Sequence, residues 1–93
     1  MSTSPDTDSY TSTVTAGPGG AMTDEVGVIT GDLTVRTTLA HDRHTACVTV
    51  QYTGADEWYT LTGSPALVPD AGLAAYHRDL LGRIRRGRGA TAT

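Results

Sequence analysis

Residues 33–52 read LTVRTTLAHDRHTACVTVQY, in which apolar and polar side chains alternate on both sides of a short polar turn. The apolar positions are Leu33, Val35 and Leu39 before the turn, and Ala46, Val48, Val50 and Tyr52 after it. A period of two is typical of a strand with one buried face. The stretch therefore predicts two strands near residues 33–40 and 45–53, joined as a hairpin.

The segments on either side of this hairpin add a third strand and a helix. Residues 57–62 (EWYTLT) predict the third strand, which ends at a Gly-Ser-Pro turn. After Pro69 the apolar period changes to that of a helix near residues 70–86, with Asp70 as N-cap and Gly87 as C-cap. The helical stripe consists of Leu73, His77, Leu80 and Ile84. Whether residues 26–30 form a separate strand is left open.

These elements predict an α+β fold: a three-stranded antiparallel β-meander packed on one C-terminal α-helix, in the order βββα. The folded domain spans residues 23–87. Residues 1–22 form an acidic tail rich in Ser, Thr, Gly and Pro, with too few large apolar side chains to fold, and are predicted to be disordered. Residues 88–93 are expected to fray. Translation from Met22 instead of Met1 is also left open.

Composition excludes several classes of protein. The chain of 93 residues has no Lys, Asn or Phe, whose codons are AT-rich, which indicates a GC-rich genome, and we expect a bacterial one. The single cysteine, Cys47, excludes an internal disulfide framework. No apolar run approaches the roughly 20 residues that a membrane span needs, and residues 1–13 lack the pattern of a secretory signal. We expect a cytoplasmic protein that binds no membrane.

The residues that often carry catalysis or bind metals do not form a convincing site. His41, His44 and Cys47 are spaced H-x2-H-x2-C, but His44 and Cys47 have opposite parity on one strand and point to opposite faces. His77 lies on the apolar helix stripe, where a packed core histidine is the usual interpretation. No glycine-rich phosphate loop is present. We therefore expect no enzyme, no cofactor, no metal and no small-molecule substrate.

The sheet face away from the helix is the best candidate for a binding site. It is predicted to carry Thr49 and Thr60 together with Arg36 and Trp58. Arginine and tryptophan are the residue types most enriched at binding hot spots. The sequence thus predicts a small interaction or regulatory module that binds a protein partner, or a second copy of itself, through this uncovered face.

The alternative is a nucleic-acid-binding module. Four arginines cluster near the end of the predicted helix: Arg83, Arg85, Arg86 and Arg88. Together with Arg36 and Trp58 they are candidates for phosphate contact and base stacking. The same arginines are also favoured simply by the helix dipole.

The layout of three strands and a C-terminal helix is similar to that of several known groups of small domains. It resembles the plant AP2-type and integrase arm-site DNA-binding domains, which implies groove reading by the uncovered sheet face. It also resembles the MbtH-like partners of peptide synthetases, although their S-L-W-P segment is missing here, and that resemblance implies a protein partner. The stretch Cys47-Val48-Thr49-Val50, followed by a strand and a helix, resembles a family of small actinobacterial proteins of unknown function found beside helix-turn-helix regulators. None of these resemblances assigns a role to a residue.

Overall fold

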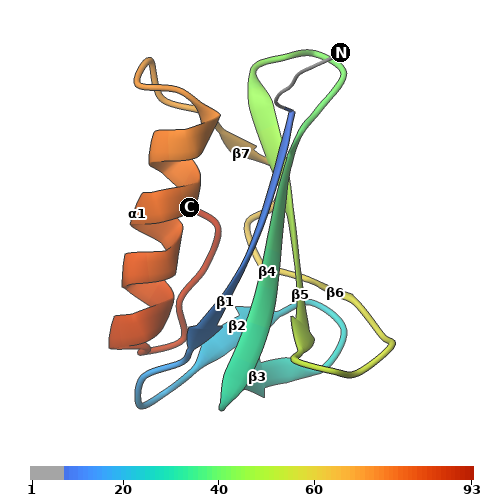
Figure 1. The fold of residues 1–93 in the computed structure, drawn as a ribbon, viewed down its shortest axis with the longest axis vertical. Coiled ribbons are helices and arrows are strands. Elements are labelled where there is room, and N and C mark those ends of the chain that lie inside the picture. Colours follow the sequence, from blue (N-terminus) through green and yellow to red (C-terminus); the bar gives the residue numbers. More distant parts are fainter. Residues whose placement is uncertain (1–7) are drawn as a thin grey trace.

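The main sheet of the protein is antiparallel and is covered on one face by a single helix (Figure 1). The computed structural model describes residues 8–93. In chain order the elements are β1 (Ser9–Thr15), β2 (Ala21–Thr23), β3 (Gly27–Ile29), β4 (Asp32–Leu39), β5 (Thr45–Tyr52), β6 (Tyr59–Thr60), β7 (Ala66–Leu67) and α1 (Leu73–Arg86). The sheet order is β1-β4-β5-β6, and β7 pairs with another part of β5. The predicted α+β class, an antiparallel sheet with one C-terminal helix, is confirmed.

The two strands predicted from the alternating stretch form the centre of the sheet. β4 and β5 pair antiparallel from Leu33 opposite Tyr52 to Leu39 opposite Ala46. Because of the alternation, every second side chain faces the helix, and Val35 and Val48 are fully buried there. Burial of these β-branched side chains stabilises the hairpin, as expected from the period of two.

The first strand corrects the prediction that residues 1–22 are disordered. β1 pairs with β4 along its whole length, from Ser9 opposite Thr38 to Thr15 opposite Asp32. Val14 is only 6% exposed and belongs to the core. A strand this polar is stabilised by its backbone hydrogen bonds to β4 and by the helix above it, neither of which its own composition reveals. Residues 1–7 of the predicted tail lie outside the described residues.

The predicted three-stranded meander also omits several strands of the structure. Residues 26–30 contain a separate strand, β3, which forms a hairpin with β2. The predicted third strand is reduced to β6, and β7 follows it as an extra short strand on β5. The backbone beyond β6 pairs with the hairpin: Asp24 N–H donates to Thr60 O at 3.0 Å, and Thr62 N–H to Met22 O at 3.0 Å.

The helix begins later than predicted and ends as predicted. Its N-cap is Gly72, whose position offers no side-chain cap, so Asp70 does not cap it. At the other end the N–H of Gly87 donates to the carbonyl of Arg83 at 3.0 Å, which confirms Gly87 as the C-cap. The buried stripe of α1 consists of Leu73, Tyr76, His77, Leu80 and Ile84. Within residues 8–93 no helix has the length and apolar character needed to span a membrane.

Residues 88–93 differ from the predicted frayed tail. The N–H groups of Arg88, Gly89 and Ala90 donate to the carbonyls of Pro18, Gly19 and Gly20 at 2.7, 3.0 and 3.0 Å. Ala92 is fully buried, and its carbonyl accepts from the Tyr76 hydroxyl. Small side chains allow this segment to lie against the hairpin and α1, where its backbone donors are satisfied.

Candidate functional site

The face of the main sheet opposite α1 carries polar side chains and is here called the open face. The antiparallel registers place on it every second residue of each long strand. Its members on β1, β4 and β5 are Ser9, Thr11, Thr13, Thr15, Asp32, Thr34, Arg36, Thr38, Thr45, Cys47, Thr49 and Gln51. The helix lies on the other side of the sheet, so these side chains are not covered by it (Figure 1).

The registers also align four of these residues in one row across the sheet. Thr11 lies opposite Arg36, Arg36 opposite Thr49, and Thr49 opposite Thr60 on β6. Directly opposed residues on antiparallel strands have Cβ atoms about 4.5–5.5 Å apart. Three of the four predicted partner-binding residues, far apart in the sequence, are therefore neighbours in the structure.

The fourth predicted residue, Trp58, joins the row through Arg36. The guanidinium carbon of Arg36 lies 4.2 Å from the centre of the Trp58 ring, within the range of a cation–π interaction. Trp58 is half-buried and Arg36 exposed. Among the hydrogen bonds of residues 8–93, none uses the Arg36 guanidinium, so its N–H groups remain available to an acceptor from outside.

The row ends at a carboxylate that sequence reasoning missed. Glu25, in the turn between β2 and β3, accepts hydrogen bonds from the Thr60 N–H at 2.7 Å and the Thr60 hydroxyl at 2.8 Å. The hydroxyl bond, followed by the backbone bond, lowers the pKa of Glu25 below its usual value. Glu25 is 35 residues from Thr60, and no local pattern connects them. Glu25 therefore connects the β2–β3 hairpin to the row of residues at Thr60.

The predicted nucleic-acid candidates do not act as one group. The Arg83 guanidinium donates to the carbonyls of Thr91 and Thr93, each at 3.0 Å, and lies 3.7 Å from Asp79. Arg83 therefore holds the segment after the helix in place. The three remaining arginines, Arg85, Arg86 and Arg88, are exposed. They lie on or beyond α1, which covers the face opposite Arg36 and Trp58, and the structure does not bring the two groups together.

A buried histidine connects the helix to the sheet. His77 Nδ1 lies 2.7 Å from the Thr37 hydroxyl and Nε2 lies 2.9 Å from the Ser12 hydroxyl. Tyr10 stacks on the same ring with the centroids 5.7 Å apart. Burial lowers the pKa of His77. Both partners of the ring are hydroxyls with no carboxylate to polarise it, so we interpret the contact as a structural cross-link and not as a nucleophile with its base. The contact between His77 and Ser12 was not predicted, because Ser12 was assigned to a disordered tail.

The candidate metal ligands remain separate. Within residues 8–93, no three His, Cys, Asp or Glu side chains lie close enough together to hold a metal ion. His41 and His44 are exposed near the β4–β5 turn, and Cys47 is exposed on the open face. The spacing H-x2-H-x2-C does not produce a cluster.

Comparison with known proteins returns no relative for this chain. No protein family, curated protein or solved structure matches it. The roles of its residues are therefore argued from contacts within the chain. The row that contains Arg36, together with Trp58, is the best-defined group of side chains on the open face.

Proposed function

We propose that this protein is a small non-enzymatic interaction module that binds a protein partner through its open face. The observation that carries the proposal is the exposed Arg36 guanidinium stacked on Trp58 in the centre of a row of threonines. Arginine and tryptophan supply much of the binding energy at protein interfaces, and they do so when surrounded by contacts that exclude water.

The stacking contact favours recognition of a carboxylate. It holds the guanidinium flat in the unbound protein, so less conformational freedom is lost when a partner binds. The edges of the guanidinium carry N–H groups in the fork that matches a carboxylate, while the exposed part of Trp58 offers apolar surface. We infer a partner that presents an acidic side chain beside an apolar one. The module needs no cofactor and is proposed to act in the cytoplasm.

A comparison of variants tests this proposal. Arg36→Ala and Trp58→Ala, each checked for an unchanged fold, are compared with the unmodified protein for the set of proteins retained from a lysate of the source organism. Tyr52→Ala is the control, because Tyr52 is an exposed aromatic residue on the same strand as Thr49 but of opposite parity. We expect both open-face variants to lose the same partner by at least about 10-fold, the loss typical of a hot spot, and Tyr52→Ala to retain it. Equal retention by all four proteins contradicts the proposal.

We place nucleic-acid binding second because Arg83, one of its four candidates, is held by the chain itself. The three exposed arginines support this alternative. If each neutralises one phosphate of duplex DNA, log K falls with log salt at a slope of about −2.7. Replacement of Arg85, Arg86 and Arg88 by Gln then abolishes binding, whereas Trp58→Ala abolishes it only if the open face takes part.

A further inference from the structure

In the part of the chain that the structure describes, the outer edge of β1 is a free edge of the main sheet. Two hydrogen bonds that flank β1 fix which residues face β4: Leu39 N–H donates to Asp8 O at 2.7 Å, and Ala16 N–H to Gly31 O at 2.9 Å. Even-numbered residues between them therefore bond to β4, since bonding alternates along an antiparallel pair. The odd-numbered residues direct their N–H and C=O groups away from the sheet; they are Ser9, Thr11, Thr13 and Thr15.

The sequence of β1 itself lacks the usual protection against pairing. Natural edge strands are protected by charged side chains, proline, bulges or a covering element. β1 reads SYTSTVT, without a charge or a proline, and its register with β4 is unbroken. Within residues 8–93, an outward N–H finds a partner only beyond the end of β1, at Gly17, which donates to the carbonyl of Ile84 at 2.9 Å. The edge from Ser9 to Thr15 is thus a template for one more strand.

We propose that the added strand is β1 of a second copy, in an antiparallel pair with a two-fold axis at Ser12. In this register Ser9 exchanges hydrogen bonds with Thr15 of the second copy, and Thr11 with its Thr13. On the helix side, Tyr10 lies opposite Val14 of the second copy. Threonine pairs and aromatic pairs with β-branched residues are favourable across strands, and no pair in this register joins like charges.

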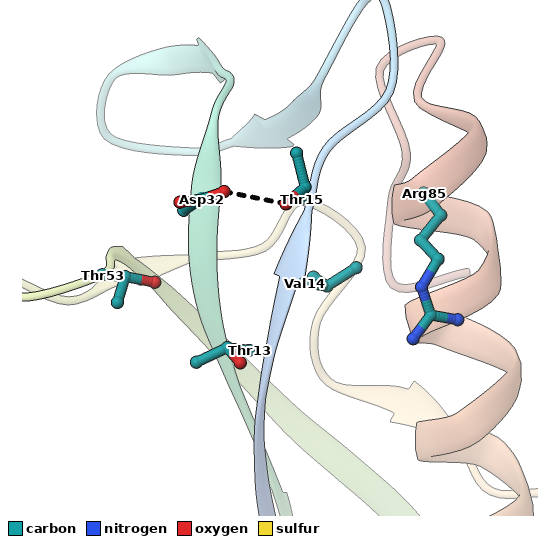
Figure 2. A pocket seen from close by; sticks show the side chains of 6 residues that line it. All are labelled: Thr13, Val14, Thr15, Asp32, Thr53 and Arg85. Carbon is teal, nitrogen blue, oxygen red and sulfur yellow. Dashed lines mark hydrogen bonds between the residues drawn. The ribbon is translucent and has the colours of Figure 1, made fainter.

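Unlike charges distinguish a second copy from any other extended peptide. Beside Thr13, Val14 and Thr15 the surface forms a hollow of about 390 Å³, and the Arg85 side chain extends along α1 on the helix side of this hollow (Figure 2). The proposed register places Asp8 of the second copy opposite Ala16, on the same side as Val14 and next to Arg85. Within residues 8–93 the Asp8 carboxylate pairs with Arg43, at 3.4 Å and largely exposed, a contact that costs little to exchange. Two Arg85–Asp8 pairs form, related by the axis.

The dimer joins two main sheets into one and places two open faces side by side. Thr11 and Thr13 lie at its centre, with one Arg36–Trp58 pair on each side. A partner with two acidic segments then binds both copies at once, which raises its apparent affinity without any new type of contact. The pairing through β1 does not depend on the proposed function, whereas the binding of a partner with two acidic segments rests on it.

Hydrogen exchange gives a test with its control built into the strand. Samples are compared from low micromolar to millimolar concentration by sedimentation and by amide exchange. We expect association with rising concentration, together with new protection of the Thr11, Thr13 and Thr15 amides. The amides of Tyr10, Ser12 and Val14 bond to β4 and stay protected throughout. A monomer at all concentrations, or association without protection of the odd-numbered amides, overturns the proposal.

Substitutions separate the edge from the open face. Thr13→Pro removes one outward N–H and is expected to give a folded monomer, whereas Thr13→Val keeps the N–H and the dimer. Asp8→Arg and Arg85→Asp each weaken association at least tenfold, and the two together restore it. If Thr13→Pro fails to fold, this charge exchange decides the question by itself. Failure of the double variant to associate, or loss of association in Trp58→Ala alone, contradicts pairing through β1.

Discussion

Gly17 donates its backbone N–H to the carbonyl of Ile84 at 2.9 Å, which fastens the end of β1 to the last turn of α1. A Cβ atom on Gly17 would lie 2.2 Å from the carbonyl oxygen of Arg85. The backbone of Pro18 lies equally close to Gly87, since a Cβ atom on Gly87 would lie 2.2 Å from the carbonyl oxygen of Pro18. The Gly-Pro-Gly-Gly segment, which resembles a linker in the sequence, is therefore a close contact between two backbones.

Gly17→Ala is predicted to destabilise the protein by about 2–3 kcal/mol, because the backbone of α1 must move to admit the methyl group. Gly82→Ala is the matched control: its Cβ would approach only the flexible end of Arg86, at 3.8 Å. Alanine inside a helix is favoured over glycine, so this variant is predicted to gain about 0.5–1 kcal/mol. Urea unfolding measures both. A Gly17→Ala variant as stable as the unmodified protein contradicts the contact.

Removal of residues 1–21 is predicted to abolish cooperative unfolding. The deletion takes away β1 with the buried Val14, and also the carbonyls of residues 18–20 that anchor the segment after α1. A domain of this size has about 5–10 kcal/mol of net stability, which the loss of a whole strand exceeds. A chain that begins at Asp8 keeps β1 and is the control. Thermal unfolding followed by circular dichroism compares the two shortened chains. Equal transition temperatures for both contradict the role given to β1.

His77 is predicted to make stability depend on pH near neutrality. Burial lowers its pKa in the folded protein below the ordinary 6.5. As pH falls through 6.5 the unfolded chain takes up a proton before the folded protein does, so the free energy of unfolding decreases. The slope is at most about 1.4 kcal/mol per pH unit. Urea unfolding between about pH 7.5 and about pH 5 measures it. His77→Gln is expected to remove the slope; a slope unchanged in this variant assigns it to other groups.

Arg83 is predicted to differ from its neighbours in the arginine cluster. Arg83→Gln removes the donors to Thr91 and Thr93 and is expected to cost about 1–3 kcal/mol, with faster amide exchange at Ala92. Arg86→Gln, on an exposed residue of the same helix, is expected to change stability by less than about 0.5 kcal/mol. Equal effects of the two substitutions contradict the structural role of Arg83.

The strands and the helix were predictable where the pattern of apolar side chains defines them. The alternation around Val35 and Val48 and the stripe that includes Leu80 reflect burial against a core, and a period is visible in the sequence. β1 is different, because Thr11 and Thr13 form a strand through backbone pairing with β4, and pairing leaves no pattern in composition. Ala92 is buried because its small side chain fits a tight space. In the sequence, such a segment of small residues has the same pattern as a frayed end.

The sequence predicted which residues share the open face, but not the contacts that connect them. The parity of Arg36, Thr49 and Thr60 follows from the strands, so their common face was correctly predicted. The stacking of Arg36 on Trp58 depends on the path of the loop after β5, which no period encodes. The anchoring of Thr60 by Glu25 depends on a hairpin that the sequence left unresolved.

The bonds between residues 18–20 and residues 88–90 also affect when the chain can fold during its synthesis. Seventy positions separate Gly20 from Ala90, which gives the fold a high contact order and a slow entropic search. A ribosome releases the β2–β3 hairpin early, but its neighbour at Ala90 only after α1 has emerged. Before that, the hairpin can pair with residues 60–62 but lacks its bonds to residues 88–90. The complete packing of the hairpin therefore forms only after residue 90 has left the ribosome.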